Sequence, residues 1–382
     1  MKAKFLLMLF FITSIVLGQD KKIDTLSFST NTTLLTFKGK INGVETNFAF
    51  DTGAAFGVVN TISATKSNVI IEGERKVTDS NEKSSRISKG KVNELSIGSF
   101  KLNDLKNVIY DMQFLHCNEL YLLGGDAINQ LNWKIDFEKK QIYVSKDPFE
   151  IQEDVLKIPI KIKGNRHFTN LNINGKKFKC LVDFGYSGFF ETNYKDDIFE
   201  DLLKQSIEKG LVTESKVSSM GLTSMSVGQK ASLFTTNAVS LDQFAIKNFK
   251  VEMSTNEKEP KVGLVFFNSI CSSMILNISE NAYFLKLNNK EINLEMGADA
   301  SCYLKDGKIT IISKIDNETS SAKNFEIGDE IKSVDGRSAA SFVSDCQFFI
   351  WRLENIRKME YKFEKMNGEM VTIKRQKLKT EN

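Results

Sequence analysis

The sequence contains few of the residues that carry metal, redox or triad chemistry. Its 382 residues include only two histidines, His116 and His167, and neither has the spacing of metal ligands or of a catalytic triad. The five cysteines form no C-x-x-C pair, and no glycine-rich phosphate-binding loop is present. We therefore expect neither a metal site nor an organic cofactor.

An excess of positive charge is also missing. The formal net charge is +4, from 52 Lys and Arg against 48 Asp and Glu, and the lysines alternate with acidic residues along the chain. Such a distribution is typical of a solvated surface, whereas nucleic-acid-binding proteins concentrate their basic residues in patches. The charge pattern argues against a nucleic-acid partner.

Long apolar runs are confined to the N-terminus. Two lysines among the first four residues precede an apolar stretch at 5–17, which is followed by Gly18. This order is typical of a secretory signal peptide, so we expect residues 1–18 to be cleaved and the protein to be exported, to a periplasm or outside the cell. An uncleaved membrane anchor is the alternative. No later segment is apolar enough for an integral membrane segment.

The cysteines are odd in number and widely spaced, at Cys117, Cys180, Cys271, Cys302 and Cys346. This pattern favours mostly buried free thiols, which pack as small apolar side chains. The histidine next to the first of them is interpreted as a surface residue on a strand. One disulfide, formed in an oxidising compartment, stays open as the alternative.

The composition predicts a mainly β protein. There are only 3 prolines but 29 phenylalanines, and many short segments rich in Val, Ile, Phe and Thr are separated by Asn-Gly or Lys-Gly pairs. These features favour strands joined by tight turns. The clearest helical pattern covers residues 196–209, where apolar residues fall on one face and Gly210 follows.

An internal repeat organises the first 290 residues. The segment 41–43, Ile-Asn-Gly, is followed by Asp51, and the segment 173–175, again Ile-Asn-Gly, is followed by Asp183 at an offset of 132 residues. In both copies the Asn-Gly pair predicts a hairpin turn, and the acid follows the apolar second strand. Each acid is therefore expected where a buried strand enters a glycine-containing loop.

Later blocks of the repeat keep the same order. They predict two homologous β lobes, residues 24–147 and 155–289, joined by a short charged connection. Chance similarity between strand-rich segments is the alternative. The repeated blocks are 95–105 with 239–249, 122–126 with 262–266, and 133–137 with 274–278.

The first acid lies in a recognisable motif. Asp51-Thr52-Gly53-Ala54 after an apolar strand resembles the active-site loop of pepsin- and retropepsin-like aspartic proteases, and the segment 122–127, Leu-Leu-Gly-Gly-Asp-Ala, resembles the apolar-glycine segment that packs beside it. An isolated Asp-Thr-Gly would be weak support. Here the strand context, the repeat and the second segment coincide.

The resemblance implies an active site between the two lobes. Asp51 and Asp183 would be facing carboxylates that share a proton, one acting as base and the other as acid toward a bound water. A glycine after each acid would allow the loops to approach closely. The residues that would support the two loops are Thr52, Gly53, Gly185 and Ser187.

The second loop departs from the family pattern. It reads Asp-Phe-Gly, with Phe184 where the family has threonine or serine. A phenylalanine cannot make the cross-loop hydroxyl hydrogen bond. Either Thr52 holds the pair from one side only, or Tyr186 or Ser187 substitutes.

Aspartic proteases also cover the cleft with a flap hairpin. Two segments, 76–90 and 220–228, have a suitable composition, and the second resembles a flap more closely. An ordinary surface hairpin is the alternative for each. The flap tip of the second segment would consist of Gly221, Leu222, Thr223 and Ser224.

Residues 294–378 resemble a bacterial PDZ domain. The Gly-Asp-Glu-Ile motif at 328–331 and the Asp-Gly pair at 335–336 mark a strand and its turn, an amphipathic helix is expected over 338–354, and a closing strand at 370–375. PDZ domains bind an extended peptide as an added strand. A purely structural role is the alternative. The peptide cradle would consist of Gly297, Ala298, Asp299 and Ala300.

Together these features predict an exported aspartic endopeptidase: a mainly β protein with two pseudo-symmetric lobes, followed by a PDZ-like β/α domain. Its partner would be a polypeptide substrate or ligand. The alternative is a non-catalytic peptide-binding protein with the same fold, which the Asp-Phe-Gly loop favours. The sequence leaves the oligomeric state open.

Overall fold

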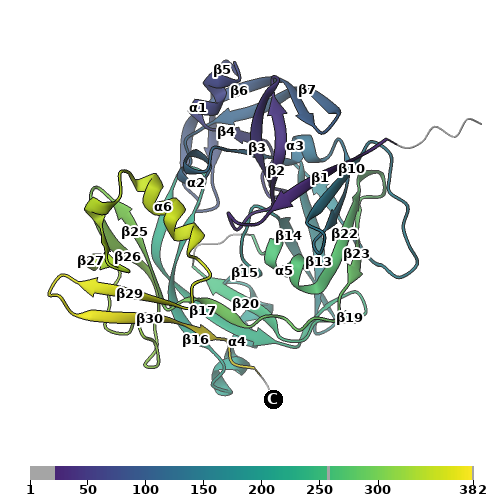
Figure 1. Ribbon diagram of the computed structural model, residues 1–382. Coiled ribbons are helices and arrows are strands. Elements are labelled where there is room, and N and C mark those ends of the chain that lie inside the picture. Colours follow the sequence, from purple (N-terminus) through teal and green to yellow (C-terminus); the bar gives the residue numbers. More distant parts are fainter. Residues whose placement is uncertain (1–21, 256–258, 381–382) are drawn as a thin grey trace, which may run out of the picture.

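The computed structural model describes residues 22–255 and 259–380. The predicted signal peptide lies outside the described residues. The chain is mainly β, as its composition predicts, and short helices lie between the strands (Figure 1). Within the described ranges, no helix is long and apolar enough to cross a membrane.

The first lobe follows the predicted hairpin pattern. Strands β2 and β3 pair around Asn42 and Gly43, whose φ angles of 47° and 83° suit a tight Asn-Gly turn. The lobe comprises β1 (Ile23–Ser29), β2 (Thr36–Ile41), β3 (Val44–Phe50), β4 (Gly57–Val59), α1 (Thr61–Lys66), β5 (Ile70–Thr78), β6 (Ser84–Ile97), β7 (Phe100–Ile109), α2 (Gln113–Cys117), β8 (Leu120–Leu123), α3 (Gly125–Ile128), β9 (Asn132–Asp136) and β10 (Gln141–Ser145).

The second lobe begins with the equivalent hairpin. Strands β13 and β14 pair around Asn174 and Gly175, with φ angles of 50° and 82°. The lobe comprises β11 (Leu156–Pro159), β12 (Lys161–Lys163), β13 (Arg166–Ile173), β14 (Lys176–Asp183), β15 (Phe190–Asn193), α4 (Asp197–Glu208), β16 (Thr213–Met220), β17 (Met225–Thr236), β18 (Val239–Leu241), β19 (Phe244–Ala245), β20 (Phe249–Ser254), β21 (Lys261–Gly263), α5 (Leu264–Ile270), β22 (Cys271–Asn277), η1 (Ile278–Glu280) and β23 (Ala282–Leu287).

Equivalent strand pairings relate the two lobes. Ile41 of β2 pairs with Leu95 of β6, and Ile173 of β13 pairs with Val239 of β18, as the repeat predicts. The expected helix is α4, and Gly210 follows it with a φ of 65°. That left-handed conformation suits glycine and ends the helix.

One antiparallel sheet joins the lobes. Its strand order is β11-β23-β22-β9-β10-β1, so that each lobe contributes three strands. The last repeated blocks pair directly with each other, with Leu276 of β22 opposite Trp133 of β9. Trp133 and Tyr283 of this sheet are fully buried, so the sheet carries part of the core between the lobes.

The C-terminal module has its own apolar core, which includes Ile311, Phe325, Ile331 and Phe363. The closing strand forms as predicted, but the helix begins at Asp345 because Ser344 caps it by accepting from the Gln347 backbone N–H. The module comprises β24 (Glu295–Ala298), β25 (Ala300–Lys305), β26 (Lys308–Ile315), β27 (Glu330–Val334), β28 (Arg337–Ser338), η2 (Ala339–Ser341), α6 (Asp345–Glu354), β29 (Glu360–Lys365) and β30 (Met370–Lys377).

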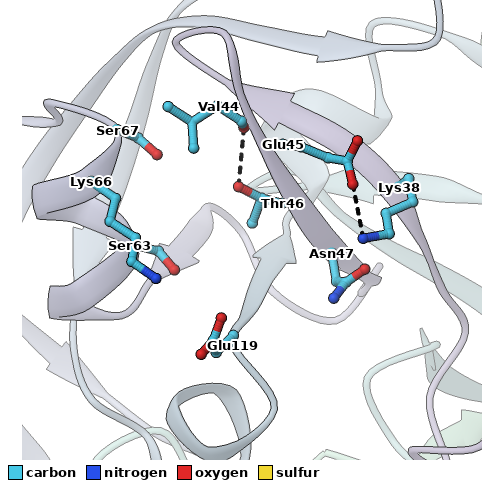
Figure 2. A pocket seen from close by; sticks show the side chains of 9 residues that line it. All are labelled: Lys38, Val44, Glu45, Thr46, Asn47, Ser63, Lys66, Ser67 and Glu119. Atoms are coloured by element: carbon cyan, nitrogen blue, oxygen red, sulfur yellow. Dashed lines mark hydrogen bonds and ion pairs between the residues drawn. The ribbon is translucent and has the colours of Figure 1, made fainter.

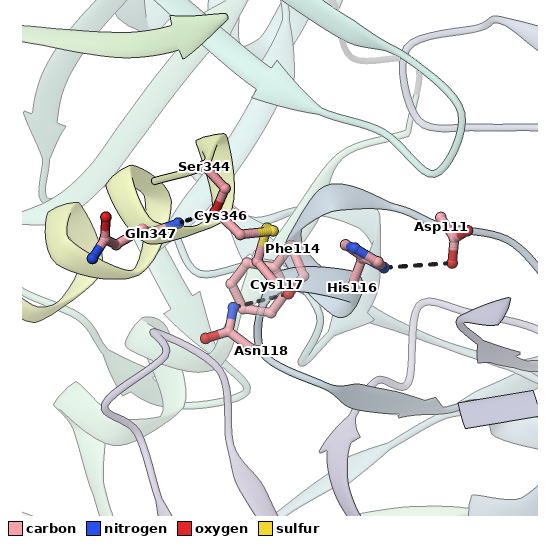
Figure 3. The surroundings of a disulfide bond; sticks show 8 residues. All are labelled: Asp111, Phe114, His116, Cys117, Asn118, Ser344, Cys346 and Gln347. Atoms are coloured by element: carbon pink, nitrogen blue, oxygen red, sulfur yellow. Dashed lines mark hydrogen bonds and ion pairs between the residues drawn. A yellow bond between two sulfur atoms is a disulfide. The ribbon is translucent and has the colours of Figure 1, made fainter. Parts of the chain in front are cut away.

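The module is attached to both lobes. Strand β26 pairs with β16 of the second lobe, with Lys216 opposite Lys314. Helix α6 is linked to α2 of the first lobe by a disulfide between Cys117 and Cys346 (Figure 3). Phe114 contacts Phe349 edge to face between the same two helices. The module therefore bridges the two lobes.

The disulfide corrects one prediction about the cysteines. Cys180, Cys271 and Cys302 are buried free thiols, as expected, but Cys117 and Cys346 are bonded. Cys117 lies on a helix rather than on a strand. The partners are 229 residues apart in sequence, so only the tertiary structure brings them together.

Candidate active site

The two acids of the repeat occupy equivalent backbone positions. Asp51 follows β3, which pairs in parallel with β8, and its N–H donates to the Leu123 carbonyl at 3.1 Å. Asp183 ends β14, which pairs in parallel with β21 and sets the acid opposite Gly263. Each carboxylate thus emerges where two parallel strands end.

The two loops pack closely against each other. A methyl group on Gly53 would lie 2.4 Å from Cγ of Asp183, and one on Gly185 would lie 2.3 Å from Oδ2 of Asp51. Any side chain at either glycine would therefore displace the opposite carboxylate. This reciprocal contact brings the two carboxyl groups face to face, and they hydrogen-bond to each other.

Backbone donors orient each acid in the same way. Oδ1 of Asp51 accepts from the N–H groups of Gly53 and Ala54 at 2.8 and 2.9 Å. Asp183 accepts from the N–H groups of Gly185 and Tyr186. Each loop folds back on its own carboxylate and leaves the other oxygen for the partner acid.

Burial and the neighbouring Asp183 charge raise the pKa of Asp51 to about 8. Burial also raises the pKa of Asp183, but the Lys261 ammonium and the hydrogen bond from Asp51 oppose that rise. Two adjacent buried carboxylates cannot both ionise at low cost. The pair therefore holds one proton near neutral pH, with Asp51 as the favoured protonated partner.

Lys261 is a residue that the sequence reasoning missed. It is almost fully buried on β21 and pairs with Glu191 at 3.5 Å, and its Nζ lies 4.6 Å from the centre of the Tyr186 ring. Burial and the Glu191 charge raise the pKa of nearby Glu252 to about 8. This cluster supplies positive charge on the side of Asp183.

Thr52 links the two loops from one side. Its hydroxyl donates to the Val182 carbonyl at 2.6 Å and accepts from the Phe184 N–H at 3.2 Å. Phe184 makes no such hydroxyl contact. Its fully buried ring stacks on Phe267 at 5.2 Å and contacts Phe50 edge to face, within the aromatic core. Ser187 is exposed on its loop.

Both flap segments are hairpins, and their tips join. Oδ2 of Asp79, at the tip of β5 and β6, accepts from the Thr223 N–H at 3.0 Å, the Thr223 hydroxyl at 3.1 Å and the Ser224 hydroxyl at 2.8 Å. Gly221 lies against the same carboxylate. Leu222 packs on an apolar cluster of the first lobe that Ala54 also contacts. We call this junction the hairpin clasp.

Removing the Asp79 carboxylate should loosen the hairpin clasp. In Asp79→Ala, the three hydrogen bonds across the clasp, worth roughly 1 kcal/mol each, are lost, together with two that Oδ1 accepts from the Asn81 and Lys83 N–H groups within the turn. We expect the backbone amide of Thr223 to exchange with deuterium roughly tenfold faster or more, as measured by mass spectrometry. Glu72→Ala, an exposed change on β5, is the control. Equal exchange in both variants would contradict the clasp.

The predicted peptide cradle spans the end of β24, Asp299 and the start of β25. The Asp299 N–H donates to the Lys374 carbonyl at 2.8 Å, and its buried carboxylate accepts from the N–H and hydroxyl of Ser321. On α6, Arg352 donates to the Cys302 carbonyl of β25 at 2.5 Å. These groups are engaged within the module, whereas Gly297 has open space around it.

A separate surface hollow of about 140 Å³ lies on the first lobe (Figure 2). Charges of both signs line it, including Lys66, Glu119 and an exposed ion pair between Lys38 and Glu45 at 3.0 Å. Neither dyad residue lines this hollow. Across the described ranges, no group of three or more His, Cys, Asp or Glu side chains is arranged to hold a metal ion.

Fold and site together define an aspartic-protease-like β protein. Residues 37–127 match a family model described as aspartyl protease. The match covers β2 to α3 and includes Asp51 with its loop, and it supports a protease-like function. No curated protein shows a significant match to the chain.

The dyad also predicts a pH-dependent stability. The pKa of Asp51 is about 8 in the folded protein and 3.8 ordinarily, so the folded state binds this proton more tightly than the unfolded state does. The proton therefore stabilises the folded state at low pH, and this stabilisation is lost as the pH rises from about 4 to 8. Asp51→Asn should gain stability over the wild type by up to about 1.4 kcal/mol per pH unit across this window. Urea unfolding at several pH values measures the difference. A pH-independent difference would contradict the geometry.

Proposed function

We propose that the chain is an exported aspartic endopeptidase in which Asp51 and Asp183 activate water to hydrolyse peptide bonds. The observation that carries this proposal is the hydrogen-bonded pair of buried carboxyl groups, each held by backbone donors of its own loop. A single shared proton gives the pair one acid and one base.

The proton distribution suggests a role for each acid. Asp183, charged and nearer Lys261, would take a proton from water as the hydroxide attacks the carbonyl carbon, while Asp51 gives its proton to the carbonyl oxygen. In the second half, Asp183 would protonate the amide nitrogen as the C–N bond breaks, and a hydroxyl of the intermediate would return its proton to Asp51. No covalent enzyme intermediate is needed.

Export and peptide capture belong to the same proposal. The N-terminal sequence and the Cys117 to Cys346 disulfide are both consistent with an oxidising compartment. The C-terminal module would be PDZ-like and bind extended polypeptide beside β25. The bond from Arg352 to the Cys302 carbonyl occupies one acceptor that such a peptide would use, so a purely structural role is the alternative for the module.

A non-catalytic peptide-binding protein is the second candidate function. The Asp-Phe-Gly loop favours it, because Phe184 supplies no hydroxyl and only Thr52 links the two dyad loops. In that case the dyad geometry would remain but turnover would be absent.

Incubating the mature chain with a diverse peptide library from pH 4 to pH 9 tests the proposal. Mass spectrometry of the products should reveal internal cleavage by the wild type and none by Asp51→Asn. Cleavage that survives in Asp51→Asn would overturn the dyad mechanism. Binding of library peptides without cleavage at any pH would favour the second function.

A further inference from the structure

A row of three apolar side chains crosses the first lobe beside the Asp51 loop. Leu122 of β8 lies opposite Val58 of β4, and Val58 lies opposite Val108 of β7. Residues that pair across strands project from the same face of a sheet. All three are buried in one apolar cluster, and Ala54 of the dyad loop packs against it. We call these three residues the first-lobe row.

The matching row of the second lobe is charged. Lys261 of β21 lies opposite Glu191 of β15, and Glu191 lies opposite Glu252 of β20. In each lobe the first of these pairings is antiparallel and the second is parallel. Nζ of Lys261 lies 4.6 Å from the centre of the ring of Tyr186, which holds the loop position that Ala54 holds in the first lobe. We call these three charged residues the second-lobe row.

The charges within the second-lobe row are unequal. Glu191 is buried and has two partners, the Ser254 hydroxyl at 2.9 Å and the Lys261 ammonium at 3.5 Å. Glu252 is only partly buried, and across residues 22–255 and 259–380 no hydrogen bond or ion pair engages its carboxyl group. Burial and the Glu191 charge raise its pKa to about 8, against the opposing Lys261 charge. Within the row, one ammonium thus serves two carboxyl groups.

A peptide bond that the dyad cleaves must approach both loops, so the side chains beside that bond come near both rows. We propose that Glu252 determines specificity: the site takes polypeptides with a lysine or arginine side chain beside the cleaved bond, on the second-lobe side. This inference rests on the proposed peptidase function. The cationic head of such a side chain supplies the positive charge that the second-lobe row lacks, and its apolar stem packs along the row. An acidic side chain would add a third carboxylate there, which like-charge repulsion disfavours.

Two hexapeptide libraries test this specificity. They are identical except for one fixed central residue, which is lysine in one library and norleucine in the other. The wild type should cleave the lysine library with a kcat/KM roughly tenfold higher or more, because a close charge pair at a partly buried site favours the matching partner. In Glu252→Gln, which keeps the size and shape of the side chain, the two values should agree within about twofold.

Glu200→Gln is the matched control. It removes a carboxylate from the same lobe, on α4, where Glu200 pairs with Lys204 at 2.8 Å. This variant should keep the wild-type preference for the lysine library. Equal cleavage of both libraries by the wild type, or a lysine preference that survives in Glu252→Gln, would overturn the inference.

Binding provides a second readout that does not depend on turnover. Asp51→Asn should bind the libraries without cleaving them, and fluorescence anisotropy should show roughly tenfold tighter binding of the lysine library. A variant that combines Asp51→Asn with Glu252→Gln should bind both libraries alike. A wild type that cleaves nothing would refute the peptidase proposal, yet this comparison would still decide the role of Glu252. Equal binding of the two libraries by Asp51→Asn, or binding of neither, would overturn the inference.

Discussion

Replacing either Asp51 or Asp183 with asparagine is expected to lower kcat roughly 10³-fold or more, and replacing both should lower it little further. The reason is that the two carboxyls share one proton and hydrogen-bond to each other, so either change removes the acid and base together. Steady-state kinetics on a single library peptide measures all three variants against the wild type.

Asp136→Asn is the matched control for this experiment. Asp136 accepts from the Lys139 N–H at 2.9 Å on the inter-lobe sheet, outside the dyad loops. Its kcat should stay within about twofold of the wild type. Losses that multiply in the double variant would mean that Asp51 and Asp183 act independently, contrary to a shared proton.

Breaking the disulfide between Cys117 and Cys346 should cause a large loss of stability. The bond closes a loop of 229 residues, and long closed loops restrict the unfolded chain most. We expect Cys346→Ser to lower the free energy of unfolding by roughly 2–5 kcal/mol, measured by urea denaturation without reductant. The C-terminal module should separate first, because the bond is its covalent link to the first lobe.

Reduction provides the control for the serine variant. A thiol reductant should lower the stability of the wild type toward that of Cys346→Ser and leave the variant unchanged. The other three cysteines are buried free thiols, so the reductant should not change them. They are Cys180, Cys271 and Cys302. An equal effect of reductant on both proteins would show that the disulfide does not carry the difference.

Local patterns in the sequence predicted much of the fold. The Asn-Gly pairs predicted the hairpins of β2 with β3 and of β13 with β14, because those turns require left-handed backbone. The helical periodicity predicted α4 within one residue at each end. These elements depend on neighbours in sequence, so no tertiary information was needed.

The sequence also predicted which acids face each other, because Asp51 and Asp183 follow identical hairpins. It did not predict the charges beside the second loop. Glu191 and Glu252 belong to no local motif, and the Lys261 charge reaches Asp183 from a neighbouring strand. Such contacts depend on side-chain positions across a sheet, and no spacing in the chain encodes them.

The sequence also did not predict how the two lobes and the C-terminal module are connected. The disulfide, the hairpin clasp and the inter-lobe sheet each join segments more than 100 residues apart. The Asp-Phe-Gly loop had suggested a weakened dyad. In the structure Phe184 enters the aromatic core instead, while its backbone N–H still donates to Thr52.

The pH dependence of kcat/KM tests the central claim most directly, namely that Asp51 and Asp183 share one catalytic proton. On a cleaved peptide, kcat/KM should fall on the alkaline side with a midpoint near pH 8, as Asp51 with its raised pKa of about 8 loses that proton. It should also fall on the acidic side, where Asp183 becomes protonated. A rate that stays constant from pH 6 to pH 10 would contradict the account.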